Sequence, residues 1–137
     1  MESNGKLVMV RRRVPKTGES GKYHLTCRFE VFEADLSDGP RLGRWKKPDN
    51  LNGRALFLST RCVKSVRASD GDGARADCIY FVGETKYGHP LRDSGVYSMV
   101  DKMIRPLMTS VAALSSRTAM LTWDSKRSPA WFFPVEV

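Results

Sequence analysis

The residues of this chain that could bind a metal or attack a substrate are few and widely spaced. His24 and Cys27 form one close pair, but Cys62, Cys78 and His89 lie far from that pair and from one another. A structural zinc site needs four such ligands, usually as two close pairs. A cysteine nucleophile needs a base that a third group orients, and nothing marks Cys27 and His24 as such a pair. We therefore expect no metal site, no cofactor and no catalytic residue.

A glycine-rich segment, Asp70-Gly71-Asp72-Gly73, has the look of a ligand-binding loop but lacks its key positions. Read as a calcium loop, it has Ala74 at the third ligand position and Phe81 where the bidentate glutamate belongs. Read as a phosphate loop, it lacks both the third glycine of a dinucleotide site and the lysine of a nucleotide triphosphate site. The segment is therefore predicted to be a tight turn.

The charge balance leaves nucleic acid open as a partner. The chain has 23 Lys and Arg against 15 Asp and Glu, a net charge of +8 and a pI near 9.7, values found among nucleic-acid binders. Many of the cations lie in the first half, at Arg11–Arg13, Lys16, Arg41, Arg44, Lys46, Lys47 and Arg54. Stacking aromatic residues are not interleaved with this charge, and strand alternation places Arg12 opposite Arg11 and Arg13. A small basic β-domain that binds nucleic acid or another anionic surface is therefore the alternative function.

Length and composition predict one globular domain. The 137 residues are 41% hydrophobic, enough for a single core. The longest apolar run, Cys78–Val82, is far too short to span a membrane, and residues 1–6 do not form a secretory signal. With three cysteines we expect reduced thiols and a cytoplasmic or nuclear location.

Alternating apolar and polar residues, separated by turn residues, predict a chain made mostly of strands. The expected strands cover residues 7–13, 23–34, 44–47, 55–58, 63–66, 78–82 and 95–100. The apolar spacing near residues 109–121 also permits one short helix. Residues 1–6 are expected to be disordered and residues 135–137 to form a short tail.

The two halves of the chain carry similar patterns, which indicates a structural repeat. Val8–Arg11 resembles Ile79–Val82, and Val31–Asp35 resembles Tyr97–Asp101. Each unit offers a strand, a turn-rich loop, a strand that ends in Asp and a shorter strand. Such units are typical of β-propeller blades, so the pattern predicts an all-β protein.

Several short motifs are more specific than this pattern. They include Trp45, the string GRALFL at residues 53–58, CIYF at 78–81, SGVY at 94–97 and the ending Pro129-Ala130-Trp131-Phe132. In this order they resemble the carboxyl-terminal end of the plant KIB-type β-propeller family, whose members usually also carry an F-box. The resemblance extends from about residue 7 to residue 134.

The resemblance implies an all-β, incomplete β-propeller of about two four-stranded antiparallel blades over residues 7–134. It also implies a non-catalytic protein-binding scaffold. In full-length relatives such a propeller recognises substrates for a ubiquitin ligase through the F-box. No helical F-box pattern occurs in these 137 residues, so we expect a truncated product, with an unknown protein target, that does not bind the ligase adaptor.

Eight residues are expected to build the core. Trp45, Leu56 and Phe57 are assigned to the contact between the two blades, Tyr80, Phe81 and Tyr97 to the core of the second blade, and Trp131 and Phe132 to the closure at the carboxyl end. With only two blades, each unit has a single neighbour. We therefore also expect exposed apolar surface from Leu56, Phe57, Tyr80, Phe81, Val96 and Trp131, and a monomer of marginal stability.

Overall fold

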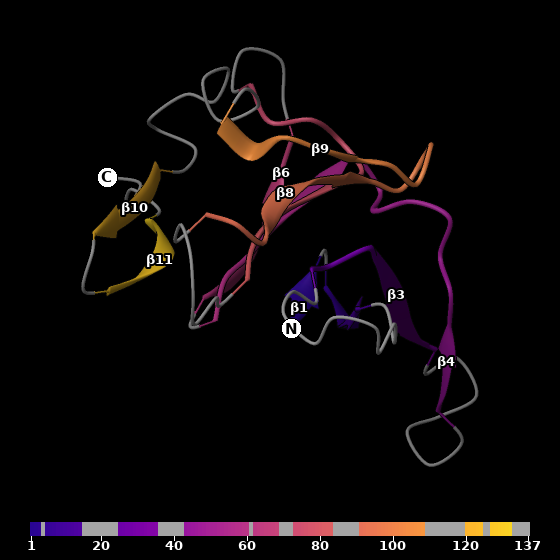
Figure 1. Ribbon diagram of the computed structural model, residues 1–137. Helices are drawn as coiled ribbons and strands as arrows, with labels where there is room; N and C mark the ends of the chain where they lie inside the picture. The colour runs from indigo at the N-terminus through magenta and orange to yellow at the C-terminus, as the bar shows by residue number, and fades with distance from the viewer. Residues whose placement is uncertain are drawn as a thin grey trace.

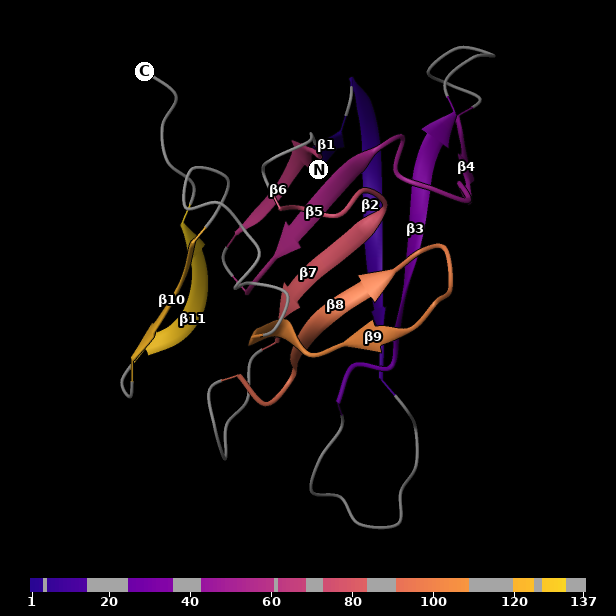
Figure 2. The same ribbon diagram turned by 90° about the horizontal axis from the view of Figure 1, so that it is seen from above.

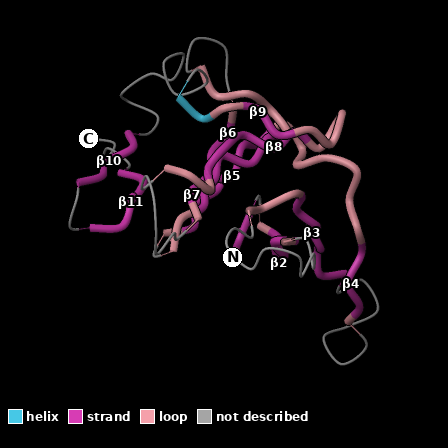
Figure 3. Tube along the Cα trace, viewed as in Figure 1, coloured by secondary structure: helices cyan, strands magenta, loops and turns pink. Residues whose placement is uncertain are grey.

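The computed structural model describes residues 1–3, 5–14, 25–35, 43–60, 62–68, 73–83, 91–108, 120–124 and 127–132. Within these ranges the chain forms strands, and the prediction of an all-β fold is confirmed (Figure 1). The strands are β1 (Glu2–Ser3), β2 (Lys6–Arg13), β3 (Arg28–Asp35), β4 (Arg44–Lys46), β5 (Arg54–Leu58), β6 (Val63–Arg67), β7 (Cys78–Val82), β8 (Ser94–Ser98), β9 (Ile104–Arg105), β10 (Met120–Asp124) and β11 (Arg127–Phe132). A helical turn begins at Leu107 and Met108 (Figure 3).

The first sheet has the order β1-β2-β3-β4, and all its pairs are antiparallel. The prediction that residues 1–6 are disordered is wrong, because β1 pairs with the start of β2. Gly5 has a φ of 76°, a conformation that glycine adopts without strain, and it turns the chain back on itself. The Val8 amide then donates to the Met1 carbonyl at 2.7 Å, and the amino terminus donates to the Val8 carbonyl at 2.9 Å.

The middle sheet has the order β6-β5-β7-β8-β9 (Figure 2). It differs from the predicted four-stranded antiparallel blade, because it has five strands and because β5 and β7 are parallel. The hairpin partner β6 occupies one edge of β5. The chain therefore returns along the other edge of β5 and enters β7 in the same direction as β5.

The predicted repeat corresponds to two antiparallel three-stranded units, β2-β3-β4 and β7-β8-β9. Their registers differ by two residues. Val10 pairs with Val31 in the first unit, whereas its counterpart Phe81 pairs with Gly95 and not with Tyr97. Because side chains alternate between the two faces of a strand, a shift of two residues keeps every side chain on its own face.

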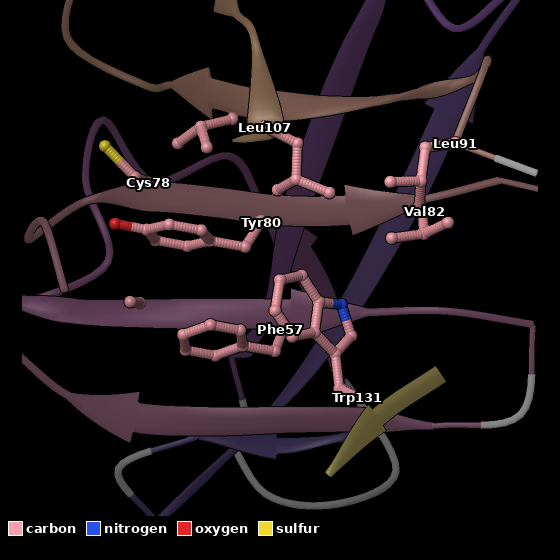
Figure 4. Close-up of a cluster of buried hydrophobic side chains, with 9 residues drawn as sticks. Phe57, Cys78, Tyr80, Val82, Leu91, Leu107 and Trp131 are labelled. Atoms are coloured by element: carbon pink, nitrogen blue, oxygen red, sulfur yellow. The ribbon is translucent and has the colours of Figure 1, made fainter. Parts of the chain in front are cut away.

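The middle sheet is buried on both faces, which explains the continuous apolar runs of β5 and β7. One face carries Leu56, Ile79, Phe81 and Tyr97 and packs on Val8, Phe29 and Val31 of the first sheet. The other face carries Phe57, Cys78, Tyr80 and Val82 and packs on Leu91, Leu107 and Trp131 (Figure 4). The first sheet, the middle sheet and the β10-β11 hairpin thus form three layers (Figure 1).

Six of the eight expected core residues are buried: Leu56, Phe57, Tyr80, Phe81, Tyr97 and Trp131. Exposed apolar surface was expected from Leu56, Phe57, Tyr80, Phe81, Val96 and Trp131. This expectation is wrong, because all six are buried and both faces of the middle sheet are covered. Trp45 is also a correction, since it is 47% exposed on the edge strand β4. The side chain of Phe132 lies outside the described residues.

The short helix that the apolar spacing permits near residues 109–121 falls mostly outside the described residues. Its last two positions, Met120 and Leu121, begin strand β10, so that end of the prediction is wrong. Their partners are Phe132 and Trp131 on β11. Trp131 binds the middle sheet through its indole N–H, which donates to the Leu58 carbonyl at 3.0 Å.

Candidate protein-interaction surface

The face of the first sheet that points away from the core carries a cluster of apolar side chains. Its register pairs Met9 with Phe32 and Ala34 with Trp45, and Leu7, two residues before Met9 on β2, lies on the same face of the strand. Leu7 is 53% exposed, Met9 42% and Trp45 47%. We call Leu7, Met9, Phe32 and Trp45 the outer apolar row. Contiguous exposed apolar residues of this kind mark interaction sites more often than scattered ones do.

The same face becomes basic toward the end of β2. Arg11 pairs in register with Glu30, and Arg13 with Arg28. Glu30 forms ion pairs with Arg13, with Arg28 at 3.8 Å and with Lys47 at 3.2 Å. Hydrogen bonds from Arg13 and Lys47 lower the pKa of Glu30 from 4.5 to about 2. One carboxylate is thus held ionised among three cations, and this cluster of four side chains carries a net positive charge.

We expect Glu30→Gln to change how stability depends on pH. The pKa of Glu30 is lower in the folded protein than its ordinary value, so the ionised carboxylate adds stability above pH 4.5. That addition is lost as the pH falls toward about 2. Chemical unfolding of both proteins across this range should show a small difference at neutral pH that shrinks on acidification. A difference that is the same at every pH would contradict the ion-pair assignment.

Three more cations of the first half form ion pairs among the described residues. Lys6 lies 2.7 Å from Glu33, Lys46 lies 2.9 Å from Asp35, and Arg12 lies 3.2 Å from Asp93. The Lys6 and Lys46 pairs lie near the surface and add little to stability, whereas Asp93 is buried. All three pairs leave fewer charges to meet a phosphate backbone. The net charge of +8 therefore does not translate into a continuous phosphate-binding patch on the described part of this sheet.

An open groove of about 940 Å³ runs along β2. Its walls come from β2 (Leu7–Val10), from Phe29 of β3 and Trp45 of β4, from Leu58 and the two residues after it, from Val63 of β6, and from Val82–Gly83 at the end of β7. The lining is mostly apolar, and Arg12 is its charged member. The groove volume is within the range of ligand-binding clefts, and the groove adjoins the outer apolar row through Leu7 and Met9. We call it the β2 groove.

The comparisons with known proteins concern the same region. The family model for the KIB1-4 beta-propeller matches residues 1–98. The chain belongs to this family. The match includes the first sheet, the β2 groove and the middle sheet as far as Ser98, so the sequence resemblance to a KIB-type propeller is confirmed. No curated protein and no solved structure matches the chain.

A buried polar contact joins the two matched sheets of this KIB-type chain. The Asp93 carboxylate accepts hydrogen bonds from the Thr26 amide and the Thr26 hydroxyl, both at 2.8 Å, and from Arg12 at 3.2 Å. The Asp93 carbonyl also accepts the Gly83 amide at 2.5 Å. Asp93 and Thr26 are both buried. We call this contact the Asp93 bridge. It joins β2 and the residues just before β3 to the end of β7 and the start of β8.

Sequence reasoning missed the residues that make this surface. Leu7 and Met9 alternate with buried Val8 and thus look like one half of an ordinary strand. Asp93 has the sequence context of a turn residue, and its partners Arg12 and Thr26 lie 81 and 67 positions away. The sequence shows only an Asp directly before the SGVY string. Its burial, which requires hydrogen-bond donors from elsewhere in the chain, is seen only in the structure.

The described residues also limit other kinds of site. Within the ranges described, no three His, Cys, Asp or Glu side chains gather as metal ligands would. His24 and His89 lie outside those ranges. Of the cysteines, Cys78 is buried, Cys62 half-buried and Cys27 exposed. In the same part of the chain no helix has the length and apolar character to cross a membrane.

Proposed function

We propose that this KIB-type propeller chain is a non-catalytic protein-binding scaffold and that its partner packs on the outer apolar row. The observation that carries the proposal is the exposure of Leu7, Met9 and Trp45 on a sheet whose other face is core. Tryptophan and methionine are enriched at protein interfaces. A partner that covers this row removes exposed apolar side chains from water, and this burial favours binding.

A protein fits this surface better than a nucleic acid does. Two of the exposed side chains, Leu7 and Met9, are aliphatic, whereas single-stranded nucleic acids need aromatic platforms for their bases. Lys47 lies 5.3 Å from the centroid of the Phe32 ring and covers that aromatic face. The cations nearby are largely paired with carboxylates. Nucleic acid therefore stays the alternative, favoured by the net charge of +8.

Partner capture is the role that we propose for these 137 residues within the family. The KIB-type propellers that the sequence resembles combine with an F-box to recognise ligase substrates. The residues matched by the family model are propeller residues. We therefore propose that this chain binds a protein target without recruiting the ligase adaptor by itself.

The proposal is tested with matched methionine variants. Proteins captured by the immobilised chain are identified, purified and titrated against it by calorimetry. We expect Met9→Glu to lower the affinity for a true partner by at least about tenfold, since a charge in the centre of an interface is costly. Met103→Glu places the same charge at a methionine that is 59% exposed in the segment before β9 and should change the affinity little.

Two outcomes would contradict this function. One is that no purified protein binds the chain, while single-stranded RNA binds with an affinity that falls steeply with salt concentration. The other is that Met9→Glu and Met103→Glu weaken the partner equally, which would remove the outer apolar row from the interface.

A further inference from the structure

Strand β2 has a free edge along most of its length. β3 pairs with β2 from Val8 to Arg13, whereas β1 covers the other edge only at Lys6 and Leu7. Met1 adds hydrogen bonds to Val8 on that edge. Among the described residues no strand pairs with this edge beyond Val8. An edge of this kind is a template for another strand.

The alternation of the backbone shows which groups this edge presents. The N–H and C=O of Val8 point toward Met1 and away from β3. In an antiparallel pair, successive residues turn these groups to opposite edges, so those of Val10 and Arg12 share the direction of Val8. Both residues also line the β2 groove. The groove therefore offers a row of main-chain donors and acceptors and not only an apolar wall.

The walls of the groove suit alternating side chains. Across from β2 lie Leu58 and Val63, and the latter is 52% exposed. Toward the end of β2 the surroundings become basic, with Arg11, Arg12 and Arg13 in sequence. A strand lying on this edge would place apolar side chains near Val63. Arg12 already pairs with Asp93 and Arg13 with Glu30, so the positive charge that such a strand meets there is chiefly that of Arg11.

We propose that the β2 groove binds an extended segment of a protein partner, which adds to the free edge of β2 as an antiparallel strand. The segment has apolar side chains in the groove and acidic residues in its amino-terminal half, beside Arg11–Arg13. This inference rests on the proposed protein-binding function and names the chemistry of the partner. Main-chain pairing supplies affinity in such complexes, and the alternate side-chain pockets supply specificity.

Charge distinguishes this occupant from a second copy of the chain. The eight residues of β2 read KLVMVRRR, of which four are cationic. Two copies paired edge to edge would bring these cations close together, and like charges facing each other across a strand pair are destabilising. An acidic segment is attracted by these cations, whereas a second copy of β2 is repelled by them.

The first experiment uses a fluorescent peptide of about nine residues, three glutamates followed by alternating valine and threonine, with fluorescence polarisation as the readout. We expect saturable binding to the full chain. N-methylation of the alternate peptide amides that face β2 removes their hydrogen bonds and should weaken binding by about tenfold or more. N-methylation of the other alternate set, which faces away, is the matched control. Equal effects of the two sets would overturn the strand-addition geometry.

The second experiment tests the groove and the charge on the protein side. Val63→Ser changes a residue that lines the groove. Its control is Val100→Ser, because Val100 is 78% exposed and does not line the groove. Arg11→Glu has a matched control in Lys102→Glu, which makes the same charge change at an exposed residue after β8. We expect each groove variant, but neither control, to weaken the peptide by about tenfold.

The outcomes separate the inference from the proposed function. If a purified protein partner still binds to the chain and is weakened by Met9→Glu, while the peptide does not bind, the strand-addition inference fails and the scaffold function stands. If the peptide with three lysines in place of the glutamates binds as well, the charge assignment fails. A concentration-dependent dimer in solution whose formation competes with peptide binding would assign the edge to a second copy instead.

Discussion

Phe57→Ala is expected to destabilise the chain strongly. Phe57 is fully buried, stacks on Tyr80 with ring centroids 4.7 Å apart and meets the edge of Trp131 at 5.0 Å (Figure 4). Removing a buried phenylalanine costs about 3–5 kcal/mol, from lost burial and the cavity left behind. That is a large share of the stability of a typical domain, about 5–15 kcal/mol. We therefore expect the urea midpoint of the variant to fall far below that of the unchanged chain.

The measurement is urea unfolding followed by tryptophan emission, which also reports the loss of the Trp131 contact. Met108→Ala, at a methionine that is 53% exposed, is the control and should change the midpoint little. A Phe57→Ala variant with an unchanged midpoint would show that the β10-β11 hairpin does not cover this face of the middle sheet in solution.

Asp93→Ala is expected to loosen the first sheet from the middle sheet. It leaves the buried Thr26 amide and hydroxyl without their acceptor and Arg12 without its carboxylate. Each buried group left unsatisfied costs about 1–3 kcal/mol. Asp101→Ala removes an exposed carboxylate paired with Arg105 and should cost much less stability.

A second variant tests the same bridge from its other side. A Cβ on Gly83 would clash with the Asp93 carboxylate and lie 2.7 Å from Nη1 of Arg12, so Gly83→Ala should displace both groups. Because the two variants break one network, their costs should be less than additive. The readout is amide hydrogen exchange, which should become faster in β2 and β3 and change less in β7. Strict additivity, or uniform exchange across all strands, would show that Asp93 does not link the sheets.

Much of the fold was predictable because it depends on local pattern. The apolar runs at 55–58 and 78–82 could be buried only as central strands, and both are. The repeat placed β2-β3-β4 and β7-β8-β9 in the right order. The short motifs identified the family, which the match over residues 1–98 confirms.

The failures concern contacts between elements distant in sequence. Trp45 is a large aromatic residue of the kind that is usually buried. It is exposed because β4 is an edge strand whose outer face is uncovered. The parallel pairing of β5 with β7 depends on which edge β6 has already occupied. Neither feature can be recognised from the neighbouring residues in the sequence, because each depends on where other strands pack.

The amino-acid order alone determined most of the strand segments from β2 to β9 and the membership of the KIB-type propeller family. Those properties follow from side-chain alternation, turn chemistry and short motifs, all of which act within a few residues. Only the tertiary structure decided which apolar residues are covered. Burial depends on the sheet opposite, so Leu56 became core while Leu7 and Trp45 became a surface. The free edge of β2 arose in the same way, from a short β1 that covers only its beginning.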